Sequence, residues 1–179
     1  MQERNRATIT LARPERGNAL GAEMVAAIVS ALDAALADGA RFVLFRGAGG
    51  NFCTGLDLSD LAEMSEGDLA LRILRIEMLP QRIHALPVMT AAVAGGRVFG
   101  AGADLFAVCD HRIALEGASF AVPGPAFGLV LGPGRLSALH GRTRRADDAG
   151  DVAALARSVA RPGLKARITT DSAARRPPA

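Results

Sequence analysis

The chain has 179 residues and a net charge of +3, and half of its residues are apolar although Trp and Tyr are absent. No apolar run reaches the roughly 20 residues that a membrane span needs, and no signal-peptide segment opens the chain. Length and composition therefore predict a soluble, cytoplasmic protein with no membrane association.

The first part of the chain alternates short apolar strands with an amphipathic helix. Residues 7–11 alternate with the period of a strand, and residues 42–45 form the continuous apolar run typical of a buried strand. Between them, apolar residues recur at helical spacing from about 22 to 38, and Gly39 supplies a stop signal.

The same alternation continues through the middle of the chain. A second helix is predicted over about residues 66–86, which Pro80 either kinks or splits. A buried strand over 88–93, a short helix over 101–109 and a strand over 111–115 follow. Strands that alternate with helices predict an α/β fold with a largely buried sheet.

The last 39 residues have a different composition. Residues 141–179 carry nine Lys and Arg against four Asp, whereas residues 1–140 carry a net charge of −2. We expect a basic tail that is partly helical over about 147–159 and disordered after Arg161-Pro162-Gly163. Such a tail either is solvated or meets nucleic acid or anionic lipid; the lack of interleaved aromatic residues favours solvation and no nucleic-acid binding.

Two glycine-bearing turns are the most informative feature of the sequence. One spans Phe52–Leu58 and the other Gly100–Leu105, and each lies where a strand gives way to a helix-like stretch. Two such turns facing each other aim two backbone N–H groups at one point, which is the arrangement that binds an oxyanion.

The two turns, with two further stretches in the same order, resemble the crotonase family, also called the enoyl-CoA hydratase/isomerase family. Residues 7–20 resemble its opening strand and loop, residues 52–58 its first signature loop, residues 100–110 its second, and residues 118–134 its third conserved stretch. The resemblance implies a crotonase-like ββα spiral core with a buried sheet over residues 1–140. The likeness stops there, so the C-terminal helical part is expected to be reduced or aberrant, as after truncation or a frame shift.

The resemblance also implies an acyl-CoA site. The backbone N–H groups of Leu56 and Ala101 are expected to bind the thioester oxygen, and Asp104 is the candidate catalytic acid or base. Coenzyme A enters as part of the substrate, with no separate cofactor and no metal. Expected contacts with the substrate come from the rest of the two loops: Gly55, Asp57, Leu58 and Gly100.

Departures from the family pattern limit this assignment. Family members place further carboxylates at the positions that are Gly124 and Gly132 here. A two-carboxylate hydration mechanism is then excluded, whereas an oxyanion hole and a one-base proton shuttle are not. Two hypotheses stay open: an enoyl-CoA hydratase/isomerase-like enzyme, or an inactive acyl-CoA-binding or oligomer-interaction remnant. The resemblance further implies a homotrimer or a dimer of trimers.

Other motifs favour structural roles. Asp57 is expected to order its loop or cap a helix, and Asp104 either stabilises the start of its helix or acts in catalysis. Cys53 and Cys109 are expected to be buried free thiols. The three histidines share no metal-ligand spacing with Cys or carboxylates, and the glycine patterns match neither a dinucleotide-binding fingerprint nor a P-loop.

Overall fold

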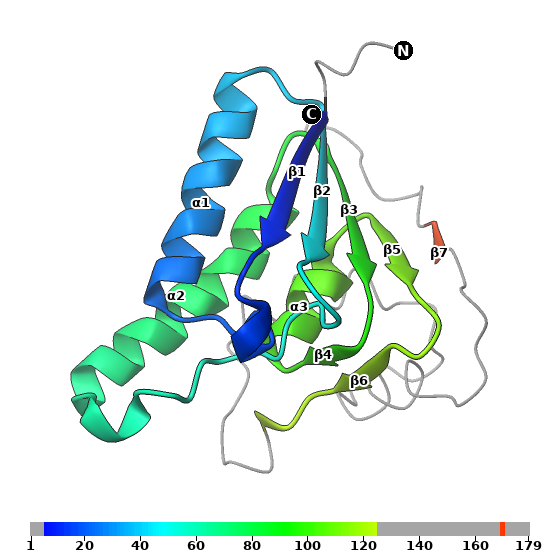
Figure 1. Cartoon of the computed structure of the whole chain (residues 1–179). Coiled ribbons are helices and arrows are strands. Elements are labelled where there is room, and N and C mark those ends of the chain that lie inside the picture. Colours follow the sequence, from blue (N-terminus) through cyan, green and yellow to red (C-terminus); the bar gives the residue numbers. More distant parts are fainter. Residues whose placement is uncertain (1–5, 125–168, 171–179) are drawn as a thin grey trace, which may run out of the picture.

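The structure is a computed structural model, and it describes residues 6–124 and 169–170. Figure 1 shows the described elements, which in chain order are β1 (Arg6–Leu11), the 3-10 turn η2 (Pro14–Arg16), α1 (Ala22–Ala37), β2 (Phe42–Gly47), the 3-10 turn η3 (Leu61–Glu63), α2 (Glu66–His84), β3 (Met89–Ala94), β4 (Arg97–Phe99), α3 (Ala101–Val108), β5 (His111–Ala114), β6 (Ser119–Ala121) and β7 (Thr169–Thr170).

A parallel sheet forms the centre of the described chain. Its strand order is β1-β2-β3-β5-β7, in which β1, β2, β3 and β5 run parallel and β7 runs antiparallel to β5. Ile9, Phe45 and Ala92 lie side by side in this register, and all three are buried. The predicted α/β fold with a largely buried sheet is confirmed, and the structure adds that β1, β2, β3 and β5 are parallel.

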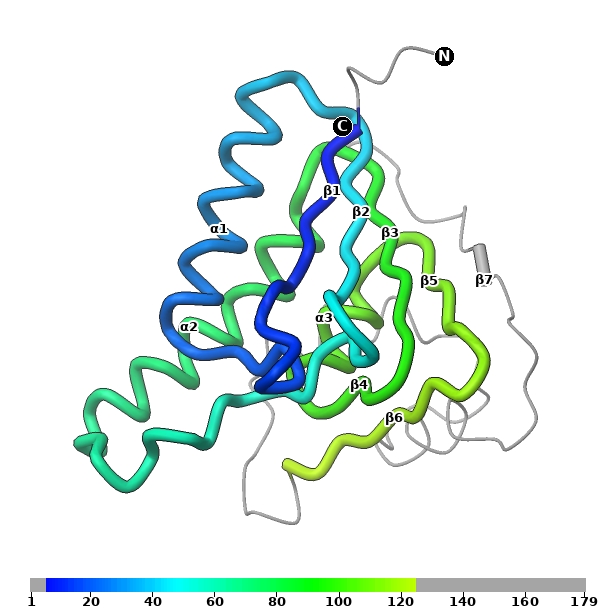
Figure 2. The backbone as a smooth tube through the Cα atoms, in the orientation of Figure 1, coloured from blue at the N-terminus to red at the C-terminus, as the bar shows by residue number. Residues whose placement is uncertain are grey.

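The connections place the helices along the sheet. Each crossover from β1 to β2, from β2 to β3 and from β3 to β5 adds the next strand on the same side of the previous one. Right-handed crossovers of this kind put their helices on one face of the sheet, and the tube in Figure 2 follows this repeated path through α1, α2 and α3. The contacts of α2 with both α1 and α3 agree with a shared layer.

Local sequence explains the helix limits. The Ser65 side chain accepts a hydrogen bond from the Asp68 N–H at 3.1 Å and so caps the start of α2. Pro80 lies inside α2, buried, and the helix continues through it to His84. Of the two predicted alternatives for Pro80, a split into two helices is therefore wrong. A proline removes only its own N–H bond, and packing of the neighbouring turns against the core stabilises the helix around it.

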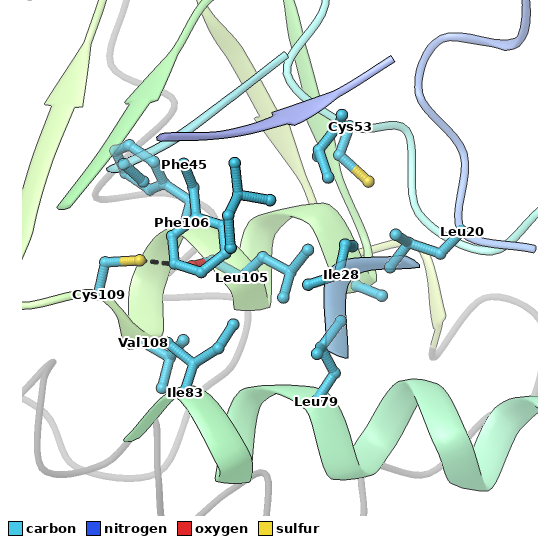
Figure 3. Packing of buried hydrophobic residues seen from close by; sticks show 14 of the residues in the cluster. Leu20, Ile28, Phe45, Cys53, Leu79, Ile83, Leu105, Phe106, Val108 and Cys109 are labelled. Atoms are coloured by element: carbon cyan, nitrogen blue, oxygen red, sulfur yellow. Dashed lines mark hydrogen bonds between the residues drawn. The ribbon is translucent and has the colours of Figure 1, made fainter. Parts of the chain in front are cut away.

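The core lies between the sheet and the helix layer. Figure 3 shows Leu79 and Ile83 of α2 pointing toward Leu105 and Val108 of α3. All four side chains are buried, and burying one such side chain contributes about 1.5–3 kcal/mol. The helix α3 is buried at every position, as expected for a helix whose residues are apolar except for Asp104.

A second, smaller sheet was not predicted from the sequence. The strands β4 and β6 pair in parallel, and Figure 1 shows them beyond the carboxyl ends of β1, β2 and β3. Phe106 of α3 packs against Phe120 of β6, with ring centroids 5.1 Å apart, and against Phe52 at 6.2 Å. These ring contacts join the small sheet to the core.

Most of the expected tail lies outside the described residues, including the helix predicted over 147–159 and the end predicted to be disordered. Thr169 and Thr170 are the exception: they fall in the end predicted to be disordered but form β7 beside His111 and Arg112 of β5, so the prediction is wrong at these two residues.

The start of α3 packs directly on the backbone of Cys53. A Cβ atom added at Gly102 would lie 2.8 Å from the Cβ of Cys53 and closer still to its carbonyl oxygen. No side chain fits between the helix and this segment, so the glycine sets how closely they approach.

We expect Gly102→Ala to lower the free energy of unfolding by about 1–3 kcal/mol, because the new methyl group forces backbone apart from backbone. Gly67→Ala is the matched control, since a Cβ there meets only the Ser65 Oγ at 3.8 Å. Alanine is the better helix former, so the control should gain up to about 1 kcal/mol. Urea denaturation of both variants measures the difference, and equal stabilities would contradict the packing described.

Candidate functional site

The first glycine-bearing turn is held on two sides by backbone hydrogen bonds. On one side the Leu20 N–H donates to the Gly55 carbonyl at 2.7 Å, and the Asp57 N–H donates to the Leu20 carbonyl at 3.1 Å. On the other side Cys53 exchanges hydrogen bonds of 3.3 and 2.9 Å with β4, through Arg97 and Phe99. The turn is therefore fixed between Leu20 on one side and β4 of the small sheet on the other.

These bonds determine where the Leu56 N–H points. In an extended segment, successive peptide groups point to opposite sides. Because the Gly55 carbonyl and the Asp57 N–H both face Leu20, the Leu56 N–H faces away from it. It has no hydrogen-bond acceptor among residues 6–124.

The second turn presents a matching group. Gly100 precedes the first residue of α3 with a φ of 51°, and its carbonyl accepts from the N–H groups of Ala103 and Asp104 at 2.9 and 3.2 Å. The Ala101 N–H, at the first helical position, has no partner within its helix, as is general for the first turn. In the described part of the chain it also has no acceptor outside the helix.

The two turns meet at Gly55. A Cβ added there would lie 2.8 Å from the Phe99 carbonyl oxygen and 3.4 Å from the Ala101 nitrogen, and its φ is +90°. Only glycine allows this approach without strain. The Leu56 and Ala101 N–H groups thus belong to neighbouring segments, at the carboxyl ends of the parallel strands where ligands of open α/β sheets bind.

Asp104 lies on α3 one helical turn after Ala101. Its side chain is buried, with 2% of the residue exposed. Residues three apart lie on the same helix face, so the Asp104 and Ala101 side chains lie on the same face of α3. Gly124 is half-buried and supplies no carboxylate, and Gly132 lies outside the described residues.

The other residues predicted to contact substrate divide into two groups. Gly55 and Gly100 shape the turns, and Leu58 is exposed over 62% of its surface. Asp57 instead has protein partners: its carboxylate accepts from Arg13 Nη1 at 2.8 Å and from the Ser59 N–H at 3.1 Å. Its predicted role in ordering the loop agrees with these contacts.

Neighbouring hydrogen-bond donors stabilise the ionised form of Asp57. Burial raises the pKa of the Asp57 carboxyl, but hydrogen bonds from Ser59 and Arg13 outweigh burial and hold that pKa below its ordinary value. An acid that stays ionised and paired is a poor proton donor near neutral pH.

Three residues that the sequence analysis did not single out organise the first loop. Asn18 is fully buried, accepts from the Arg13 N–H at 2.9 Å and donates to the carbonyls of Ala48 and Asn51 at 2.9 and 2.7 Å. Arg13 then reaches Asp57. The third residue, Arg72, lies in α2 and forms an ion pair with Asp60. Arg13 and Asn18 lie within residues 7–20, which the family resemblance covers, whereas nothing local in the sequence marks Arg72.

The two cysteines fit structural roles. Cys53 and Cys109 are buried free thiols, as predicted. Burial raises the pKa of Cys53 to about 12, so its reactive thiolate is scarce near neutral pH. Over the described ranges no three side chains of the metal-ligating types gather into a group.

The lowered pKa of Asp57 predicts a pH-dependent stability. Its folded-state value lies below the unfolded value of 3.8, so its stabilising contribution is present above the unfolded pKa and is lost as pH falls through the folded-state pKa. We expect Asp57→Asn to be less stable than wild type near neutral pH, with a gap that narrows below about pH 4. Urea denaturation across this range measures it.

Asp33→Asn is the control, because it breaks only the exposed ion pair with Arg82, and such pairs contribute about 0–1 kcal/mol. A difference between wild type and Asp57→Asn that stays constant with pH would contradict the assignment.

In the described ranges, no helix has the length and apolar character to cross a membrane. The cytoplasmic location stays a prediction, because some of the similar proteins are named as mitochondrial.

Comparison with known proteins places this architecture in one family. A family model described as enoyl-CoA hydratase/isomerase matches residues 2–159. The chain is similar to the mitochondrial enoyl-CoA hydratase domain-containing protein 2 of Bos taurus, with 35% identity over 130 residues that cover 72% of this chain and 44% of that protein. It spans about half the length of the relatives it matches.

Solved structures agree. A Bordetella parapertussis protein named for enoyl-CoA hydratase/isomerase is 45% identical with a TM-score of 0.73, covering 89% of this chain and 62% of that one. An enoyl-CoA hydratase from Bacillus anthracis is 30% identical with a TM-score of 0.68, covering 76% of this chain and 55% of that one. The predicted crotonase-like fold is confirmed, and the chain belongs to the enoyl-CoA hydratase/isomerase, or crotonase, family.

Proposed function

We propose that this protein binds an acyl-CoA thioester and stabilises its enolate, with the carbonyl oxygen held by the backbone N–H groups of Leu56 and Ala101. Asp104 is the acid or base that moves a proton on the acyl chain. Coenzyme A is part of the substrate, and no separate cofactor takes part. The activity is that of an enoyl-CoA hydratase/isomerase-like enzyme.

One observation carries this proposal: two N–H groups without acceptors in the described chain come from adjoining turns. A developing oxyanion gains most from donors that are already fixed, because no reorganisation is then needed. The Leu56 N–H is fixed by the bonds of its neighbours to Leu20, and the Ala101 N–H by the start of α3. The helix dipole adds positive potential at the second donor.

A single carboxylate favours proton transfer within the substrate over hydration. Asp104 takes a proton from a carbon next to the polarised carbonyl or conjugated with it, and the electron pair moves onto the thioester oxygen as an enolate. When the enolate collapses, Asp104 returns the proton to another carbon, so the double bond moves. Hydration also requires an activated water, for which a second carboxylate normally serves.

The alternative is an inactive acyl-CoA-binding or oligomer-interaction member of the family. It is favoured by Gly124, where the family resemblance leads us to expect a second acid. Assembly as a trimer or a dimer of trimers is part of both proposals.

Ala101→Pro tests the proposed donor directly. Proline at the first helical position suits the helix but has no N–H, so we expect the conversion of a 3-enoyl-CoA to its conjugated isomer to slow by about 10²–10³. Ala22→Pro is the matched control, since Ala22 also follows a glycine as the first residue of a helix, α1. Wild-type turnover in Ala101→Pro would contradict the proposed role of this N–H.

Asp104→Asn separates the two hypotheses. Gain of conjugated thioester absorbance from a 3-enoyl-CoA measures the proposed double-bond shift, and loss of that absorbance from crotonyl-CoA measures hydration. Calorimetry with a saturated acyl-CoA measures binding. We expect the variant to lose about 10²–10⁴ in turnover while it still binds, because only the proton carrier is removed. Binding without turnover in the wild type supports the inactive member instead, and absence of binding would exclude both.

A further inference from the structure

The segment after Leu56 contacts two arginines that come from different parts of the chain. Arg13 lies between β1 and η2, and Arg72 lies in α2. Arg13 reaches the Asp57 carboxylate, whereas Arg72 reaches the Asp60 carboxylate and the Asp57 carbonyl. We call residues 57–60 the clamped segment.

The Arg13 side of the clamp is rigid. Its main chain is fixed by Asn18, whose side chain accepts from the Arg13 N–H at 2.9 Å and whose N–H donates to the Arg13 carbonyl at 2.8 Å. The ion pair itself lies against the backbone of Gly21, where an added Cβ would be 3.4 Å from both Arg13 Nη1 and Asp57 Oδ2. On this side the segment is held by one contact of 2.8 Å between Arg13 Nη1 and Asp57 Oδ2.

The Arg72 side uses the whole guanidinium group. Nη1 and Nη2 bind the two Asp60 carboxylate oxygens at 2.6 and 2.7 Å, and Nη1 also lies 3.4 Å from the Asp57 carbonyl oxygen. Only 10% of the Arg72 side chain is exposed. Its Nε, also buried, has no hydrogen-bond acceptor in the described chain.

Stability alone does not explain an arginine whose buried Nε has no hydrogen-bond acceptor in the described chain. The Asp60 side chain is 46% exposed, and an ion pair so open to solvent contributes only about 0–1 kcal/mol. What this pair does supply is geometry, because a bidentate guanidinium–carboxylate contact fixes both distance and orientation. The geometry it fixes begins one residue after the Leu56 N–H.

We propose that Arg13 and Arg72 are positioning residues, which together hold the clamped segment and thereby fix the direction of the Leu56 N–H. This inference rests on the proposed role of that N–H at the thioester oxygen. The bonds of Leu20 fix one edge of the turn, and the two arginines fix the chain that leaves it. Displacement of a positioned group by about 1 Å is enough to lose about 10²-fold in rate.

The first experiment measures the clamp without any ligand. Amide hydrogen exchange is followed at Asp57, whose N–H bonds to Leu20, and at Ser59, whose N–H bonds to the Asp57 carboxylate. In Arg72→Ala we expect both amides to exchange at least about tenfold faster than in wild type, because charge-assisted hydrogen bonds to the segment are lost. Unchanged exchange overturns the proposal.

The second experiment measures the consequence at the thioester. A conjugated 2,4-dienoyl-CoA absorbs at longer wavelength when its carbonyl oxygen accepts strong hydrogen bonds. We expect wild type to shift the bound spectrum and Arg72→Ala to lose most of that shift. A full shift in Arg72→Ala overturns the proposal. No shift with wild type rejects the proposed function instead, and the exchange measurement then decides on the clamp alone.

Conservative variants and a matched control separate positioning from general destabilisation. Arg13→Lys should retain the spectral shift, since one ammonium replaces one N–O contact, whereas Arg72→Lys should retain only part of it, because lysine cannot bind Asp60 in bidentate fashion. Arg82→Ala removes another arginine of α2, from the exposed pair with Asp33, and should leave shift and exchange at wild-type values. Equal effects of Arg82→Ala and Arg72→Ala on shift and exchange overturn the proposal. If Arg72→Ala does not fold, the same measurements on Arg72→Lys decide the proposal.

Discussion

The direct packing of α3 on the backbone near Cys53 is the contact on which the rest of the site depends. Gly102 on the helix and Gly55 on the turn leave no side chain between the two segments. The start of the helix is therefore brought beside the turn, and a main-chain N–H from each lies in the same region. Because these donors belong to the backbone, their directions follow from the paths of helix and turn rather than from side-chain identity.

Burial of α3 gives this region an unusual electrostatic setting. A helix start carries partial positive charge, and Asp104 places a carboxyl group within the same buried turn. In the proposed proton transfer, Asp104 becomes neutral as the thioester oxygen becomes an enolate. The negative charge then moves from one side of the helix start to the other, and the site never has to stabilise two anions at once.

This chain retains the family's backbone N–H donors more fully than its acid–base side chains. Backbone donors survive almost any substitution that keeps the turn, whereas acid–base chemistry depends on particular side chains. This chain keeps both turns and Asp104 but has Gly124 where a second acid is expected. It also spans about half the length of the relatives that it matches.

Hydrophobic periodicity and the glycine turns determined much of this protein from the sequence alone. They predicted β1, α1, β2, α2, β3, α3 and β5 within a few residues, because each element buries a face with a readable period. The strands β4 and β6 have three residues each, too few to show a period, and only pairing with each other and packing on α3 defines them. Tertiary structure alone also decided the partners of Asp57 and Asp60. Arg13 is 44 residues from Asp57 and Arg72 is 12 residues from Asp60, and only folding brings such distant charges together.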